Sequence, residues 1–202
     1  AIGKALTEVC APAAGRRKDQ IIINALDQVP ANYDIPQDYA GNVSGISARM
    51  VQHAGAILSH HAVPVEDRYF IAPYAVLELM LANQEFVTRQ WVGDLRPALE
   101  GKIAYYGGFK WIFIANNPEG GMPYIDNGNG TYRYNCFACH KRALEVAVGE
   151  GNVGGSGVAM TRIDRVPEKG SWIVNAPLSC GAAVIENKGI VRVKADVPAL
   201  AA

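Results

Sequence analysis

The strongest local constraint in this sequence is a turn-forming segment, residues 126–130, that is followed at once by a run favouring extended structure. The segment reads Asp-Asn-Gly-Asn-Gly, and these residue types accept the positive backbone φ of tight turns. Tyr124 precedes the turn, and the β-favouring residues Thr131, Tyr132 and Tyr134 follow it. The sequence therefore predicts a β-hairpin in which residues 131–139 form the second strand.

The predicted strand leads into Cys136-Phe-Ala-Cys139-His140, which has the spacing of a c-type haem attachment site. Such a site needs both cysteines on one side of the backbone, as a helical turn provides. In a strand, residues three positions apart face opposite sides. Zinc is also disfavoured, because there is no second Cys-x-x-Cys pair. We therefore expect no cofactor and no metal, and a c-type haem or redox module centred on Cys136, Cys139 and His140 is the alternative.

Two further patterns could suggest an enzyme. Residues 149–154, Gly-Glu-Gly-Asn-Val-Gly, match the dinucleotide-binding pattern, which requires a helix that begins at the last glycine. Gly-Ser-Gly and a strand-like segment follow instead, so a loop is predicted. His53, His60 and His61 could be combined with Cys139 or Asp67 into a nucleophile, a base and an orienting acid. No loop suited to stabilising an oxyanion accompanies them. We expect no enzymatic activity.

The composition excludes other classes of function. At 202 residues the chain can bury one substantial core. Lys plus Arg and Asp plus Glu each number 19, so no net positive field is available to hold nucleic-acid phosphates. No apolar stretch approaches the roughly 20 residues that a membrane-spanning helix needs. The short run Arg16-Arg17-Lys18 is interpreted as a solvated helix face.

Hydrophobic periodicity divides the rest of the chain into helices and strands. Helical spacing predicts a helix over residues 18–29, a second helix capped by Ser44, and a third that opens at Pro73. Extended segments are predicted at residues 68–72, 109–114, 158–166 and 189–194. Helices and strands that do not alternate regularly indicate an α+β fold and not a doubly wound sheet.

The order of these segments resembles the major capsid protein family of tailed bacteriophages, whose shared architecture is the Hong Kong type, or Johnson, capsid fold. The motifs that carry the resemblance are KDQIIINAL at residues 18–26, VPVEDRYFIAP at 63–73, GGFK through IANN at 107–117, FACHKRAL at 137–144 and GIVRV at 189–193. The resemblance implies an α+β subunit with an axial domain, whose mixed sheet is flanked by helices, and part of a peripheral domain.

The resemblance also implies a domain organisation and a function. Residues 1–40 would hold a peripheral-domain spine helix remnant and a connector, residues 41–157 the axial domain, and residues 158–202 the peripheral-domain strands with a return through the axial domain. The subunit would self-assemble through pentamers and hexamers into an icosahedral shell that encloses double-stranded DNA. Scaffolding, portal or cement proteins would be further partners, packaged DNA would be held only non-specifically, and no membrane would take part. The implied location is the virion capsid, assembled in the host cytoplasm.

One charged segment is expected to contact neighbouring subunits in such a shell. Its charges alternate in sign around a proline: Arg162, Asp164, Arg165, Glu168 and Lys169. The strands around residues 161–165 and 189–194 are both expected to belong to the peripheral domain. A net charge near zero suits a shell protein, because many neutral copies repel one another less at contact distance.

Overall fold

The computed structural model describes residues 2–83, 86, 103–115, 120–149, 162–166, 171–175 and 179–198. Its helices are α1 (Ile2–Leu26), α2 (Ala48–His60) and α3 (Tyr74–Ala82). Its strands are β1 (Asp34–Ile35), β2 (Arg68–Pro73), β3 (Tyr105–Tyr106), β4 (Phe109–Ile114), β5 (Tyr124–Asp126), β6 (Thr131–His140), β7 (Leu144–Val148), β8 (Arg162–Val166), β9 (Ser171–Asn175), β10 (Cys180–Val184) and β11 (Ile190–Pro198). Short 3-10 turns lie at Ala31–Tyr33, Tyr39–Gly41, Lys141–Ala143 and Asn187–Gly189.

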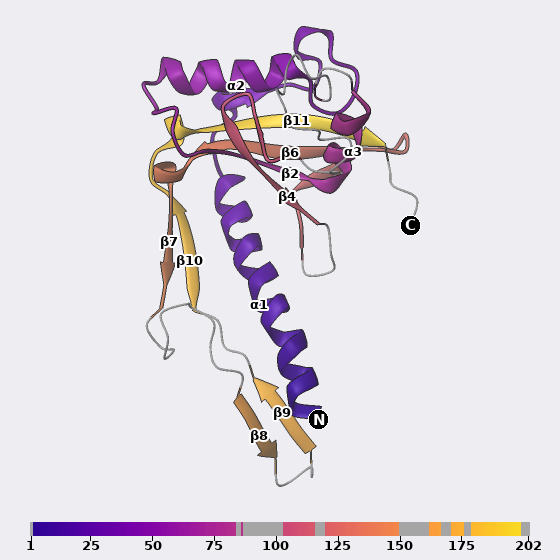
Figure 1. The fold of residues 1–202 in the computed structure, drawn as a ribbon, viewed down its shortest axis with the longest axis vertical. Coiled ribbons are helices and arrows are strands. Elements are labelled where there is room, and N and C mark those ends of the chain that lie inside the picture. The colour runs from indigo at the N-terminus through magenta and orange to yellow at the C-terminus, as the bar shows by residue number, and fades with distance from the viewer. Residues whose placement is uncertain are drawn as a thin grey trace.

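A mixed sheet of seven strands forms the centre of the molecule, in the order β1-β11-β6-β2-β4-β3, with β5 paired to β6 (Figure 1). The strand β6 lies between β11 and β2 and is antiparallel to both, whereas β2 and β4 are parallel. The predicted hairpin is confirmed, because Tyr124 pairs with Tyr134 across the turn at residues 126–130. The predicted extension of residues 131–139 is also confirmed.

The core lies between this sheet and the helices. Phe70 on β2 and Phe109 on β4 are fully buried, and their rings meet edge to face at 5.7 Å. On α2, Met50, Ala54 and Leu58 recur at four-residue spacing and are fully buried, so one face of this amphipathic helix covers the sheet. Figure 1 shows α2 along one side of the sheet, with α1 leaving from the other side.

Local chemistry explains where α2 begins and how β3 turns into β4. Ser47, and not Ser44 as predicted, caps α2, because its hydroxyl accepts a hydrogen bond from the backbone N–H of Met50 at 3.3 Å. Gly107 and Gly108 join β3 to β4 with φ of 62° and 84°, the left-handed conformation that two-residue hairpin loops require.

The helix α1 differs from the prediction at its start. It begins at Ile2 and includes Pro12, whereas apolar periodicity predicted a helix only over residues 18–29. Its end at Leu26 is three residues earlier than predicted, because the N–H of Val29 bonds to the carbonyl of Leu26 and so closes a turn. Of the helices in the described part of the chain, none is both long and apolar enough to cross a bilayer.

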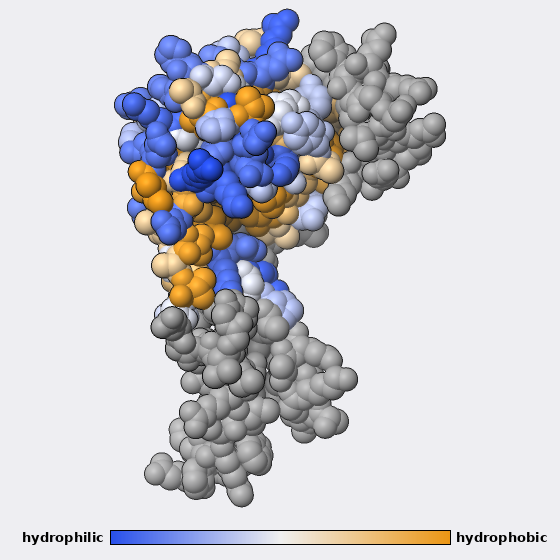
Figure 2. Space-filling view, turned by 60° about the vertical axis from the view of Figure 1, so that its left-hand side comes forward, coloured by the Kyte–Doolittle hydropathy of each residue, from blue (hydrophilic) through white to orange (hydrophobic). Residues whose placement is uncertain are grey.

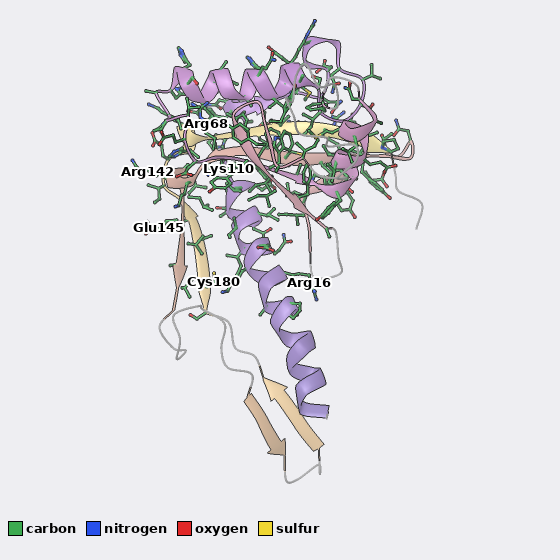
Figure 3. The ribbon with its side chains drawn as sticks, viewed as in Figure 1. Arg16, Arg68, Lys110, Arg142, Glu145 and Cys180 are labelled. Atoms are coloured by element: carbon green, nitrogen blue, oxygen red, sulfur yellow. The ribbon has the colours of Figure 1, made fainter. Side chains whose placement is uncertain are left out.

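Between β6 and β11 the chain leaves the main sheet and forms a separate arm, defined here as β7 to β10. β7 pairs antiparallel with β10, and β8 pairs antiparallel with β9 (Figure 1). β10 packs against α1, which runs beside the arm on the same side of the sheet. Figure 3 shows Glu145 and Cys180 on the arm and Arg16 on α1.

The strand partners separate two segments that the resemblance placed in one peripheral domain. Residues 162–166 form β8, which pairs with β9, while residues 190–198 form β11, which lies in the main sheet between β1 and β6. The two segments are therefore not strand partners, and their assignment to a common domain stays a prediction. The domain boundary predicted at residue 157 falls outside the described residues.

Candidate functional site: the central strand, two polar junctions and the arm

The central strand β6 positions the two cysteines of the haem-like motif. Cys136 lies opposite Val193 of β11, and Cys139 lies opposite Ile190 of β11 and Tyr69 of β2. The two cysteines are three positions apart in a regular strand, so their side chains point to opposite faces of the sheet. One porphyrin or ion cannot bind both, and the structure gives no support to a haem or redox module.

Burial makes these thiols chemically inert. Cys136 is fully buried and Cys139 is 7% exposed. Removal from water raises the pKa of the Cys139 thiol to about 12 and also raises the pKa of the Cys136 thiol. Both stay protonated at neutral pH, whereas a metal ligand or nucleophile must be a thiolate. Within the described residues, no group of three or more His, Cys, Asp and Glu could hold a metal ion.

The contacts described for the histidines are those of residues that stabilise the fold. His140 is buried at the end of β6, and its Nδ1 accepts a hydrogen bond from the backbone N–H of Arg142 at 3.2 Å. His53 stacks on Tyr39 at 4.4 Å between ring centroids. His60 and His61 lie at the C-terminal end of α2, as predicted. The histidines considered with Cys139 are thus on or beside α2, while Cys139 is buried in β6. Of the glycine-rich pattern at residues 149–154, only Gly149 lies within the described residues.

The first buried polar junction is built around Arg68, which is 4% exposed at the start of β2. Its Nε donates to the carbonyl of Pro64 at 2.8 Å, and its Nη1 donates to the carbonyl of Gly55 at 3.2 Å. Its Nη2 donates to the carbonyl of Val63 at 2.6 Å and to Oγ of Ser59 at 3.0 Å. Burial lowers the pKa of this guanidinium. Arg68 therefore fastens the end of α2 to the sheet (Figure 3).

The second junction fastens α1 to β11 through Arg192. Its Nη2 donates to the backbone carbonyls of Asp27 and Val29 at 2.7 and 2.6 Å, just beyond the end of α1. The last carbonyls of a helix lack intrahelical partners and carry partial negative charge, so a guanidinium is well suited to this position. Asn135 on β6 donates to the Asp27 side chain at 2.9 Å. The direction in which α1 leaves the sheet is thus fixed by side chains of β6 and β11.

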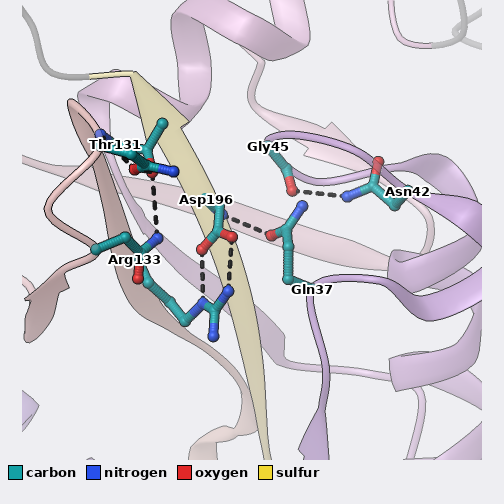
Figure 4. A network of polar contacts seen from close by, with 8 residues as sticks. Gln37, Asn42, Gly45, Thr131, Arg133 and Asp196 are labelled. Atoms are coloured by element: carbon teal, nitrogen blue, oxygen red, sulfur yellow. Dashed lines mark hydrogen bonds and ion pairs between the residues drawn. The ribbon is translucent and has the colours of Figure 1, made fainter.

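A third polar network closes the edge of β11 (Figure 4). Arg133 forms a two-pronged ion pair with Asp196, with N···O distances of 2.6 and 2.7 Å, and this contact lowers the pKa of the Asp196 carboxyl. The backbone N–H of Asp196 donates to Oε1 of Gln37 at 2.6 Å, and its carbonyl accepts from the N–H of Gly45 at 2.7 Å. The connector between β1 and α2 therefore supplies hydrogen-bond partners for the backbone of β11 in the part of β11 that lies beyond its pairing with β1.

Three of the five charged residues predicted to contact neighbouring subunits lie in the arm. Arg162, Asp164 and Arg165 belong to β8, where they pair in register with Asn175, Ile173 and Trp172 of β9. Glu168 and Lys169 lie outside the described residues. Their contacts with other subunits stay a prediction.

Solved structures with a similar fold include a phage capsid and an encapsulin. The chain is similar to a structure from Mycobacterium phage Che8, with a TM-score of 0.62 and 15% identity over 94% of this chain and 62% of that one. It is similar to the capsid structure of the cyanophage P-SCSP1u, with a TM-score of 0.60 and 14% identity over 99% of this chain and 66% of that one. It is also similar to the holo-SrpI encapsulin complex of Synechococcus elongatus PCC 7942, with a TM-score of 0.57 and 12% identity over 94% and 63%. The α+β capsid fold expected from the sequence is confirmed.

The family model described as phage capsid protein matches residues 3–197. The chain therefore belongs to the phage capsid protein family, a family of structural proteins of the virion shell, as the resemblance implied. No curated protein sequence matches this chain. The chain spans just under two thirds of the length of the solved structures above, with 62%, 66% and 63% of those chains covered.

Proposed function

We propose that this chain acts as a major capsid subunit, a structural and non-enzymatic protein whose copies associate through pentamers and hexamers into an icosahedral shell around double-stranded DNA. The observation that carries the proposal is the family match over residues 3–197. The elongated shape supports it, because a globular head joined to an arm and a long helix offers several separate surfaces to neighbouring copies (Figure 1).

The arm gives a physical reason for association. A two-stranded sheet in water is at best marginally stable by itself, and β7 and β10 pair only with each other among the described strands. Apolar side chains gather on this side of the molecule (Figure 2), where Val146, Val148 and Ile185 are 38%, 41% and 62% exposed. Contact with further copies would cover these side chains and so stabilise both the arm and the shell.

The assignment of parts of the chain to an axial and a peripheral domain is part of the proposal, and the separation of the main sheet from the arm supports it. The main sheet with α2 and α3 would be the axial domain that meets its copies around the symmetry axes. α1 and the arm would be the peripheral part, with Arg162, Asp164, Arg165, Glu168 and Lys169 in contact with neighbouring subunits. Packaged DNA would be held only non-specifically, and weakly, because a net charge of zero gives little attraction for its phosphates. Scaffolding, portal or cement proteins would assist assembly in the host cytoplasm.

Negative-stain microscopy and analytical ultracentrifugation of the purified chain test this proposal. We expect rings or closed shells above a threshold concentration, because identical heterologous contacts close by rotation. A sample that sediments as a monomer at every concentration, in both low and moderate salt, would refute it. Resistance of co-purified DNA to nuclease then separates shells that enclose DNA from empty shells.

A further inference from the structure

We infer that the two opposite edges of the main sheet are complementary docking surfaces, so that the β1–β11 edge of one copy receives the β3–β4 edge of the next. The inference rests on the proposed self-association and names the surfaces that carry it. Strand order places β1 and β3 at opposite edges. Around a rotation axis each copy meets its two neighbours through two different surfaces, so one edge has to fit the other.

The β1–β11 edge carries a polar hollow beside a projecting valine. The hollow is lined by Pro36, Gln37, Asp38, Asn42, Val43, Arg133, Lys194 and Asp196. Val43 is 89% exposed at its rim, far more than an aliphatic side chain with a partner. Because no described residue covers Val43, it is available as a knob that a neighbouring copy can bury.

The side chain of Gln37 indicates that this hollow binds a residue of another copy. It is only 8% exposed, and its orientation is fixed, since Oε1 accepts the N–H of Asp196 at 2.6 Å. The amide Nε2 is consequently a donor, and it has no hydrogen-bond partner among the described residues. Buried donors in folded proteins are nearly always satisfied, so we assign to this one an acceptor brought by another copy.

The β3–β4 edge repeats the same arrangement with different residues. Its hollow is lined by Val65, Glu66, Asp67, Arg68, Tyr105, Gly108 and Lys110. Val65 is 61% exposed and Tyr105 is 52% exposed. Each edge therefore pairs one exposed valine with one hollow, and the valine of either copy can enter the hollow of the other.

Each edge carries charges of both signs, so oppositely charged side chains can meet when one edge docks on the other. Glu66 at one edge and Asp38 at the other are exposed, and neither forms an ion pair with a described residue. In the inferred contact, Glu66 approaches Arg133 and Lys194, and Asp38 approaches Lys110. Arg133 already pairs with Asp196, and Lys194 pairs with Asp34 at 2.9 Å, so each would bind a second carboxylate. Lys110 already bonds Asp67 at 2.9 Å, and its ammonium has further donors for a second acceptor.

The two hollows lie towards opposite ends of the strands as well as at opposite edges. Arg68 pairs with His140 at one end of β6, whereas Asp196 pairs with Arg133 near the other end. The line that joins the hollows therefore crosses the sheet diagonally. In a ring closed by this contact, the strands of the main sheet run at an oblique angle to the radius of the ring.

Cysteine cross-linking tests the pairing. In a background with Cys10 and Cys180 replaced by serine, Val43→Cys and Val65→Cys are introduced together, and assembled material is treated with a short bis-maleimide. We expect covalent multimers that extend to the size of one ring. Mixing a Val43→Cys chain with a Val65→Cys chain should stop at covalent dimers, because each chain then has only one reactive edge.

The matched control combines Val43→Cys with Gln52→Cys, because Gln52 is exposed on α2 and lies at neither edge of the sheet. This control should give no ladder. Particles that form normally, while the Val43 and Val65 pair gives no cross-link, would overturn the inference and leave the proposed function standing. Cross-linked dimers from Val43→Cys alone would also overturn it, since they would show like edges in contact. Absence of any particles would refute both.

Discussion

Replacing Arg68 by methionine provides a direct test of how α2 is held on the sheet. Methionine is similar in length and removes all five donors of the guanidinium. It leaves the carbonyls of Val63 and Pro64 and the hydroxyl oxygen of Ser59 without the donor that now serves them, in a site where Arg68 is 4% exposed. We therefore expect the variant to be strongly destabilised.

The size of the effect follows from two opposing contributions. Three unsatisfied acceptors cost about 1–3 kcal/mol each, or roughly 3–9 kcal/mol together. Removal of a buried charge returns several kcal/mol of desolvation energy. A net loss of about 3 kcal/mol in the free energy of unfolding results. With a urea slope of about 2 kcal/mol per molar, the unfolding midpoint should fall by roughly 1.5 M.

The assay is urea unfolding followed by circular dichroism, at a protein concentration below the assembly threshold. Arg49→Met is the matched control, because Arg49 is exposed on the same helix and should change stability by less than about 0.5 kcal/mol. Arg68→Lys should lie between the two, since an ammonium cannot reach all four acceptors. A midpoint for Arg68→Met within roughly 0.3 M of the unmodified chain would refute this reasoning, given the same slope.

Three further predictions follow. Arg192→Met should free the end of α1 and raise amide hydrogen exchange in residues 20–29, with a loss of about 2 kcal/mol, because two carbonyls and an ion pair lose their donor. Asp196→Asn should make the free energy of unfolding depend less on pH in the acid range. The pKa of Asp196 is lower in the folded chain than in the unfolded chain, so the carboxylate stabilises the fold above its unfolded pKa. This stabilisation is lost as the pH falls through the pKa of the folded chain. Reversing the charges of Arg162, Asp164 and Arg165 together should lower particle yield measured by sedimentation, without changing the urea midpoint of the unassembled subunit.

Each of these has a matched control. Lys188→Met removes an exposed cation next to β11 and should leave hydrogen exchange in α1 unchanged. For Asp196→Asn, stability is compared at pH 6 and near pH 3, and an unchanged difference between the two would contradict the assigned role. For the charge reversal, an unaltered particle yield would remove the β8 residues from the subunit contacts.

The sequence predicted best those elements whose signals are local. The hairpin at residues 126–130 and the strand β6 follow from turn residues and from β-branched and aromatic side chains next to them, and these preferences are independent of distant partners. The prediction that Cys136 and Cys139 cannot share a ligand follows directly from that strand. The start of α1 was missed, because residues 2–17 lack the apolar periodicity that identified its second half.

The features that depend on distant residues were beyond sequence reasoning. Arg68 begins an otherwise apolar strand, which is a weak signal for a buried cation, but its acceptors belong to residues 55–64 and are fixed only by the fold. The partner of β8 and the contact between Gln37 and Asp196 are also non-local. Gln37 is 159 positions from the backbone that it satisfies, and no local pattern encodes such a pairing.

The arm is inserted between β6 and β11, two neighbouring antiparallel strands of the main sheet. Both of its chain crossings leave the sheet at the same end, from His140 and from Ile190. A pull on the arm therefore loads β6 and β11 in the same direction, so it neither peels them apart nor slides one past the other. In the proposed shell, stress from the curvature of the lattice would be delivered to the longest strand pair of the sheet, the nine register pairs of β6 and β11.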